Sequence, residues 1–143
     1  GALSNMTCED ESMACALYEA ALSVDPDLII MVLAATEQVK AVKSLGCAYA
    51  CEIFADRAYN DDATLVDRSK PGAVIHDAEL AGRRMVEMQA QAIITESGKH
   101  IPTPIDTICL HGDGATAVQM ANAVRNKLEI SKISVGTFRG RLE

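Results

Sequence analysis

The hydrophobic positions of the chain follow two patterns that alternate along its length. Apolar residues spaced three or four apart predict helices over 7–24, 36–46, 77–97 and 115–130. Short apolar runs predict strands over 28–33, 49–55, 106–110 and 133–135. The run Leu28–Leu33 contains no polar residue, which is typical of a parallel strand covered on both faces. This alternation predicts an α/β domain with mostly parallel strands and right-handed crossovers.

Short polar residues and glycines mark the predicted element boundaries. Residues 1–6 are expected to be a polar lead-in, and Thr7 with Asp10 resembles a capping box that starts the first helix. Gly46 and Gly98 are placed to end the second and third helices, because glycine tolerates the left-handed backbone of a helix C-terminus. These signals predict long helices with few interruptions.

Composition excludes several classes of partner. The chain has 143 residues, 49% of them hydrophobic, so we expect one domain with a sizeable core. Its net charge is -7 and 3% of its residues are aromatic, which argues against nucleic-acid binding. No apolar run approaches the ~20 residues of a membrane span, and no signal peptide precedes the first helix. We therefore expect a soluble cytoplasmic protein. The cysteines lack zinc-site or CxxC spacing and are expected to be reduced, buried thiols: Cys8, Cys15, Cys47, Cys51 and Cys109.

Candidate chemistry gathers where the predicted strand 106–110 ends. His111 and Asp113 flank Gly112, which allows a sharp turn there. Because ligands bind at the carboxyl ends of parallel strands, the two side chains are candidate proton-transfer groups, and the carboxylate is also a candidate metal ligand. In the alternative interpretation Asp113 caps the last helix and His111 is merely hydrogen-bonded. The two interpretations are compatible, and both stay open.

The same turn also matches a dinucleotide-binding pattern. Gly112–Ala117 reads G-x-G-x-x-A after a predicted strand and before a predicted helix. That pattern needs an acidic residue about 20 positions further on, at the end of the next strand, and 134–138 offers none. Asp113 inside the turn would also repel a phosphate. A nucleotide site is therefore disfavoured, and no Walker A sequence is present.

A second group of polar residues follows the predicted strand 49–55. Its members are Glu52, Asp56, Arg57 and Tyr59, with Arg68 on the aperiodic stretch 60–75. An arginine beside a strand end is suited to a bidentate contact with a substrate carboxylate, and a loop of this length is typically a lid or a binding loop. In the alternative interpretation Asp56 and Arg57 are a solvated surface pair of little energetic weight. Proximity to the His-Gly-Asp turn would decide between the two.

Four motifs in order carry a family resemblance: Glu52–Asn60, Leu65–Ser69, Pro71–Ile75 and Ile108–Asp113. They resemble successive motifs of the LamB/YcsF family, to which the A subunit of bacterial ATP-dependent 5-oxoprolinase belongs. Gly1–Asn5 resembles the end of that family's Lys-Pro-His-Gly-Ala-Leu-Tyr-Asn motif, with a cut directly after the His. The resemblance covers essentially the whole chain but only the C-terminal part of a family member.

The resemblance implies a seven-stranded β/α-barrel-like fold related to polysaccharide deacetylases. Residues 1–143 would then be a single α/β domain, an incomplete barrel that lacks the N-terminal strands. The implied activity is the ATP-dependent opening of 5-oxo-L-proline to L-glutamate together with partner subunits B and C. ATP would be a co-substrate of the full complex, and a divalent metal is left open.

The resemblance also suggests roles for individual residues. Asp113 and His111 would handle protons as the lactam is activated and hydrolysed. Arg57 or Arg68 would hold the substrate carboxylate. The expected substrate-binding residues are Glu52, Asp56, Arg57, Tyr59 and Arg68, and no metal ligand is assigned.

Two alternatives belong to other functional classes. In the first, the chain is a non-catalytic module whose open sheet edges pair with another chain or a second copy, because natural proteins pair or cover such edges. In the second, it is a metal-dependent deacetylase-like hydrolase, which would need Asp and His ligands that this chain alone does not supply.

Overall fold

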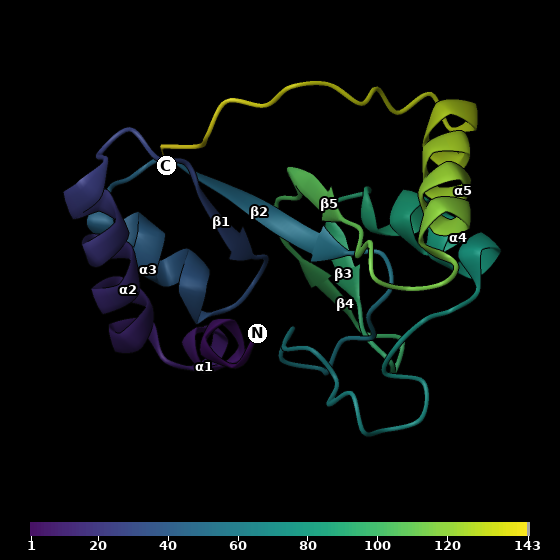
Figure 1. Ribbon diagram of the computed structural model, residues 1–143, viewed down its shortest axis with the longest axis horizontal. Helices are drawn as coiled ribbons and strands as arrows, with labels where there is room; N and C mark the ends of the chain where they lie inside the picture. The colour runs from purple at the N-terminus through teal and green to yellow at the C-terminus, as the bar shows by residue number, and fades with distance from the viewer. Residues whose placement is uncertain (143) are drawn as a thin grey trace.

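A parallel three-stranded sheet organises the chain, in a computed structural model that describes residues 1–142 (Figure 1). Its strands are β1 (Ile30–Leu33), β2 (Tyr49–Phe54) and β5 (Thr107–Cys109), in the order β1-β2-β5. In the register, Glu52 lies opposite both Leu33 and Thr107, and Phe54 lies opposite Cys109. The predicted α/β class with parallel strands is confirmed, and within the described residues this sheet is not closed into a barrel.

Five helices accompany the sheet in the part of the chain that the structure describes: α1 (Ala2–Glu9), α2 (Glu11–Val24), α3 (Glu37–Leu45), α4 (Ala78–Met88) and α5 (Ala117–Ile130). Helices α1 to α3 gather beside β1, whereas α4 and α5 pack against each other near β5 (Figure 1). Helix α3 confirms the prediction for 36–46, and Gly46 ends it with a φ of 63°. None of these helices has the length and apolar character needed to cross a membrane.

The sheet has one covered side and one partly open side. Along β2, Cys51 and Ile53 are 0% exposed, whereas the alternate residues Glu52 and Phe54 are half-buried. Met31 lies opposite Ala50, and 48% of its surface is exposed. The prediction that 28–33 is covered on both faces is therefore wrong, because part of this strand faces solvent.

The predicted helix over 7–24 is in fact two helices. Asp10 has an extended backbone, and its carboxylate accepts a hydrogen bond from the Met13 amide at 2.9 Å as the N-cap of α2. The Thr7 hydroxyl instead donates to the Ser4 carbonyl at 2.9 Å within α1. The expected polar lead-in 1–6 and the capping box from Thr7 are therefore wrong, because the capping carboxylate starts a new helix.

The predicted helix over 77–97 is also wrong beyond its first part. It ends at Met88, and Gln91 takes a left-handed φ of 74°. An antiparallel hairpin follows, formed by β3 (Ala92–Ile94) and β4 (His100–Pro102). Gly98, with a φ of 85°, lies in the turn of this hairpin and does not close a helix. The β-branched residues of β3 favour an extended strand over the helical pattern that the preceding residues set.

The predicted strand over 133–135 is absent from the described residues. After α5 the chain turns at Lys132, which has a φ of 60°, and crosses the molecule toward the start of β2 (Figure 1). There Arg141 and Tyr49 exchange backbone hydrogen bonds of 3.1 and 2.7 Å. The short run is interrupted by Ser134, and the neighbouring Gly136 further weakens it as a strand.

The cysteines are free thiols, as expected. Cys8 and Cys51 are buried, but Cys15, Cys47 and Cys109 are only half-buried. The expectation that all of them are buried is therefore only partly met.

Candidate active site

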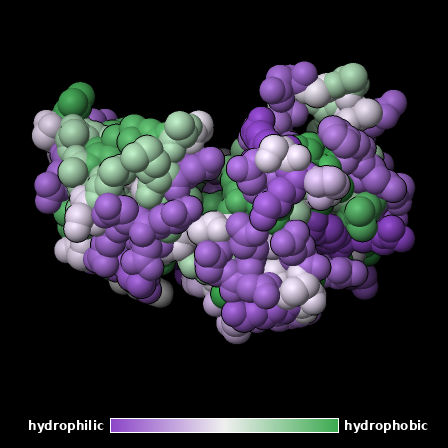
Figure 2. Space-filling model, turned by 90° about the horizontal axis from the view of Figure 1, so that it is seen from below, coloured by the Kyte–Doolittle hydropathy of each residue, from purple (hydrophilic) through white to green (hydrophobic). Residues whose placement is uncertain are grey.

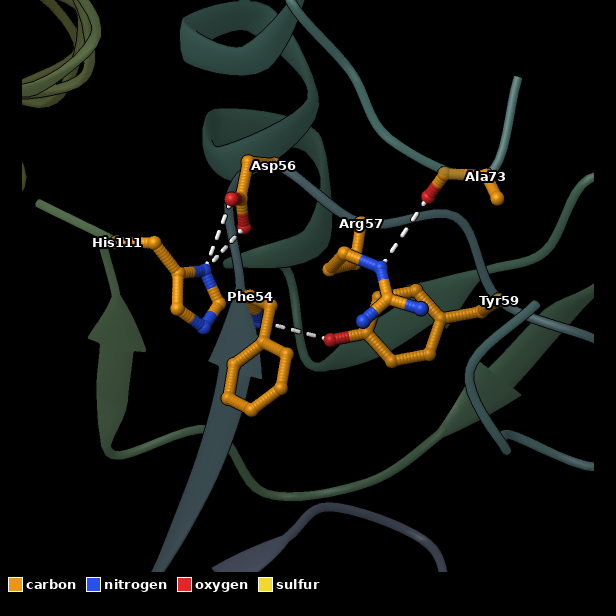
Figure 3. A network of polar contacts seen from close by, with 6 residues as sticks. All are labelled: Phe54, Asp56, Arg57, Tyr59, Ala73 and His111. Carbon is orange, nitrogen blue, oxygen red and sulfur yellow. Dashed lines mark hydrogen bonds and ion pairs between the residues drawn. The ribbon is translucent and has the colours of Figure 1, made fainter. Parts of the chain in front are cut away.

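Asp56 and His111 meet at the carboxyl ends of two neighbouring strands. Strand β2 ends at Phe54 and β5 ends at Cys109, which lie opposite each other in the sheet. Each site residue comes two positions beyond one of these strand ends, so parallel pairing brings them to the same edge. The His111 Nδ1 atom lies 2.9 and 2.8 Å from the two carboxylate oxygens of Asp56 (Figure 3).

This contact and a neighbouring ring orient the imidazole. The Nδ1 atom faces the Asp56 carboxylate, and in Figure 3 the Nε2 atom points away from Asp56. The Phe54 ring meets the imidazole edge-on, with ring centroids 5.3 Å apart. The His111 side chain is 31% exposed, against 15% for Asp56. The histidine is thus held on two sides and still accessible to a ligand.

A pocket of about 180 Å³ brings the two predicted groups of residues together. Its charged and titratable lining consists of Asp56, Arg57, Arg68, His76, His111 and Asp113. The interpretation of Asp56 and Arg57 as a solvated surface pair is therefore wrong. A larger cavity of about 590 Å³ lies between β5, α5 and the segment 133–138, but its lining is mainly apolar and contains no histidine. The candidate chemistry belongs to the smaller pocket.

Arg57 is buried, with only 5% of its surface exposed. Its Nη2 atom donates to the Val66 carbonyl at 2.7 Å and its Nε atom donates to the Ala73 carbonyl at 3.3 Å. Burial lowers the pKa of Arg57, and the neighbouring Arg68 charge lowers it further. Two of its guanidinium nitrogens therefore donate to the loop that follows β2. Arg68, by contrast, is exposed.

Tyr59 lies inside the core and cannot contact a ligand in the pocket. Its exposed fraction is 0%, and its hydroxyl accepts a hydrogen bond from the Phe54 amide at 2.7 Å (Figure 3). Burial raises the pKa of this phenol. The expected substrate contact of Tyr59 does not fit this position. The residue instead holds the end of β2, immediately before Asp56.

Glu52 lies on the partly open side of the sheet and does not line the pocket. Burial raises the pKa of its carboxyl, and the nearby His111 opposes this shift. Cys109, in the next strand, has its pKa raised to about 11 by burial and by the charges of Glu52 and Asp56. Because the thiolate is disfavoured, Cys109 is unsuited as a nucleophile.

Asp113 borders the same pocket, but the carboxylate that contacts the histidine is that of Asp56. Helix α5 begins after Thr116, and no side chain caps its first turn. The alternative in which Asp113 caps this helix is therefore wrong. His76 also lines the pocket and was not predicted. It directly precedes Asp77, the N-cap of α4. The sequence signal that could have indicated His76 as a site residue was its place beside a predicted helix start.

Fold and site together define an α/β protein with a histidine–carboxylate contact at the carboxyl ends of parallel strands, where ligands bind in this class. The chain belongs to the LamB/YcsF family, whose model matches residues 1–143. This confirms the resemblance carried by the four motifs.

Individual relatives place the chain more closely within the family. It is 65% identical over 139 residues to the 5-oxoprolinase A subunit of Ruegeria pomeroyi, covering 96% of this chain and 55% of that protein. It is 46% identical to the 5-oxoprolinase A subunit of Nitrobacter hamburgensis, covering 97% of this chain and 55% of that protein. The crystal structure of a lactam utilization protein from Thermus thermophilus matches with a TM-score of 0.83 and 33% identity, covering 96% and 55% of the two chains. The chain thus spans about half the length of the relatives it matches.

Proposed function

We propose that this chain forms part of the active site of the A subunit of an ATP-dependent 5-oxoprolinase, which hydrolyses 5-oxo-L-proline to L-glutamate. The observation that carries the proposal is the Asp56–His111 contact in a pocket that Arg68 also lines. The substrate combines a cyclic amide with a carboxylate, so its enzyme needs both a proton-transfer group and a cation. The names of the relatives support the same substrate class.

In this proposal His111 moves the protons of ring opening. Its Nε2 atom takes a proton from the water that attacks the amide carbon, and returns it to the ring nitrogen as the carbon–nitrogen bond breaks. Asp56 keeps Nδ1 protonated and stabilises the imidazolium between these two steps. Asp56 therefore acts on the histidine and not on the substrate, a refinement of its expected binding role.

The remaining carboxylates take supporting roles. We assign Asp113, which lines the same pocket, to a second proton-transfer position close to the substrate. Glu52, on the sheet side that carries the Phe54 ring, is assigned to the polar part of the substrate that extends over the sheet.

ATP and further subunits complete the proposed reaction. An unstrained amide resists hydrolysis, and ATP as co-substrate of the complex with subunits B and C supplies the driving force. Within residues 1–142 no three His, Cys, Asp or Glu side chains are grouped as ligands of one metal ion. These residues therefore give the deacetylase-like alternative no support, and no step is assigned to a metal.

We also propose that the sheet is part of the family's seven-stranded β/α-barrel-like fold, and that the complete protein is cytoplasmic. Two observations support the barrel: β1 is paired along one edge only among the described residues, and Met31 on this strand is exposed. A further strand along β1 would cover both. Pairing with another copy of the chain remains the competing use of this edge.

A chimera tests the proposed function. The part of the Ruegeria pomeroyi relative that this chain does not match is joined to Gly1, and the product is mixed with subunits B and C. We expect glutamate formation that requires both ATP and 5-oxo-L-proline. The Asp113→Asn variant should lose this activity while its circular dichroism is unchanged. If the chimera folds but converts no lactam, the proposed function is wrong. If the chimera is active and the Asp113→Asn variant is equally active, the role of Asp113 is wrong.

A further inference from the structure

We propose that the two arginines of the pocket have different tasks: Arg68 binds the substrate carboxylate, and Arg57 is a positioning residue that holds the loop carrying Arg68. This assignment rests on the proposed function for its ligand, but the positioning role of Arg57 is testable without that ligand. It resolves the choice between two arginines that the sequence leaves open.

Arg57 donates hydrogen bonds to the loop on both sides of Arg68 in the sequence. The two carbonyls that accept from its guanidinium belong to Val66, before Arg68 in the chain, and to Ala73, after it. Figure 3 shows the guanidinium beside the loop, with its Nε–H directed at Ala73. One planar side chain therefore fixes both ends of the short segment that presents Arg68 to the pocket.

The same segment is fastened by its backbone and by a small core of its own. The Ala58 amide donates to the Ala73 carbonyl, and the Val66 amide donates to the Ala58 carbonyl, each at 3.0 Å. The side chains of Ala58, Val66 and Ala73 form a separate buried cluster. Of the two expectations for this loop, a lid or a binding loop, these contacts favour a binding loop in this part of it.

A second anchor holds the beginning of the loop. The Asp61 carboxylate accepts hydrogen bonds from the hydroxyls of Thr95 and Ser97, both at 2.6 Å, and these residues lie in the β3–β4 turn. The Lys99 ammonium adds a bond to the Asp61 carbonyl at 2.9 Å. Arg57 is therefore the anchor nearest to Arg68, while Asp61 restrains the beginning of the loop.

Arg68 has the properties of the ligand-binding partner. It lines the pocket, its side chain is exposed, and it makes no hydrogen bond or ion pair with the other residues that the structure describes. A guanidinium with free donors binds a carboxylate through two parallel hydrogen bonds. Arg57 and Arg68 also lie close enough for their charges to repel, and an anion bound at Arg68 would relieve this repulsion.

The positioning role is tested on the chain itself by amide hydrogen exchange. Arg57→Lys keeps the charge but loses the planar pair of donors that Nε and Nη2 present to the two carbonyls, so exchange of the Ala58 and Val66 amides should accelerate about tenfold or more. Arg68→Lys and Arg83→Lys, a substitution at an exposed site on α4, should leave these amides unchanged. Arg57→Gln is the second variant, should Lys perturb folding. Unchanged protection in Arg57→Lys, or global unfolding of both Arg57 variants, would overturn the positioning role.

The carboxylate role is tested by KM and kcat of the assembled chimera. Arg68→Gln should raise the KM for 5-oxo-L-proline about 30-fold with a much smaller fall in kcat. Arg57→Lys should raise KM about tenfold, and should add nothing further in the Arg68→Gln background, because it acts through Arg68. Additive effects of the two substitutions on KM, or an unchanged KM in Arg68→Gln, would overturn the assignment of the two arginines. Turnover by the chimera without substitutions would still uphold the proposed function. Absence of turnover in the chimera without substitutions would count against the proposed function. The hydrogen-exchange experiment would still test the positioning role of Arg57.

Discussion

Two contacts between a carboxylate and a nitrogen-bearing side chain join β2 to its surroundings at opposite ends of the sheet, and they differ in chemistry. At the carboxyl ends, Asp56 meets His111, whose imidazole keeps one nitrogen directed away from this contact. At the amino ends, Asp106 meets Arg141, which stays charged. The comparison sets the contact that we propose for proton transfer against one that fastens two segments of the fold.

At the amino end, both oxygens of the carboxylate have hydrogen-bond partners within the protein. The Arg141 Nε atom lies 2.9 and 2.7 Å from the two oxygens of Asp106, and the Cys51 amide donates to the same carboxylate at 2.8 Å. These bonds fasten the C-terminal segment to the start of β2. At the other end, the Nε2 atom of His111 has no hydrogen-bond partner among the described residues.

Figure 2 shows the molecule from below as two lobes, of which the one on the right, away from α1 to α3, is mainly hydrophilic.

The largest effect should follow from changing the carboxyl-end contact. We expect His111→Gln to lower kcat of the assembled chimera by about 100-fold or more, because general acid–base catalysis contributes about that much. Thermal unfolding should barely change, since the side chain is partly exposed.

His100→Gln is the matched control, because His100 is an exposed histidine on β4 and lies outside the pocket. Its kcat should equal that of the natural chimera. Full turnover in His111→Gln would mean that the contact with Asp56 is structural and would remove the difference between the two ends.

The opposite result is expected at the amino end. Asp106→Asn removes the charge that pairs with Arg141 and weakens the bond from Cys51, so the free energy of unfolding should fall by about 2 kcal/mol. Urea unfolding of the chain measures this, with Asp27→Asn, at an exposed position, as control. An unchanged midpoint would show that the contact does not stabilise the fold.

The pH dependence of the stability of Asp106→Asn provides a second test of this contact. Burial acts to raise the pKa of Asp106, but the hydrogen bonds from Arg141 and from the Cys51 amide outweigh it, so the pKa is lowered. A lowered pKa means that this stabilisation is present above the ordinary aspartate value of about 3.9 and is lost as the pH falls through the folded value. The difference between the natural chain and Asp106→Asn should therefore shrink on acidification. A difference that grew would contradict the ion pair.

The sequence predicts the carboxyl-end contact better than the amino-end one. Asp56 and His111 both follow apolar strands of clear pattern, and parallel pairing places such residues at one edge whatever the loops do. Arg141 belongs to a segment without periodicity, so nothing in its neighbours indicates that it reaches Asp106. Local pattern predicts where strands end but not which distant segment returns to them.

The errors within the fold and the site share a physical origin. The helix predicted over 77–97 fails because the apolar residues of β3 continue the helical spacing while the backbone reverses at Gln91. Arg57 and Tyr59 lie beside a strand end like Asp56, but their side chains turn toward loop carbonyls and the core. Residue type indicates what a side chain is able to bind, and only the packing of the loop decides which partner it reaches.

The smallest expected effect concerns Glu52, whose raised pKa contrasts in sign with the lowered pKa of Asp106. Burial raises the pKa of Glu52 more than the nearby His111 lowers it, so the fold favours the neutral carboxyl. The stabilising contribution is then present below the ordinary glutamate value of about 4.3 and is lost as the pH rises through the folded value. Near pH 7 the ionised group is a burden that Glu52→Gln removes.

We therefore expect Glu52→Gln to raise the thermal midpoint near neutral pH by about 2 °C, a modest gain because the side chain is half-exposed and water screens its charge. The gain should vanish below about pH 4, where both chains carry a neutral group. Calorimetry across this range measures it, with Glu19→Gln on the exposed surface of α2 as control. A gain that persisted in acid would reflect packing of the amide. If the same variant also raised the KM for 5-oxo-L-proline, Glu52 would be a residue that sacrifices stability for function, in contrast to Asp106.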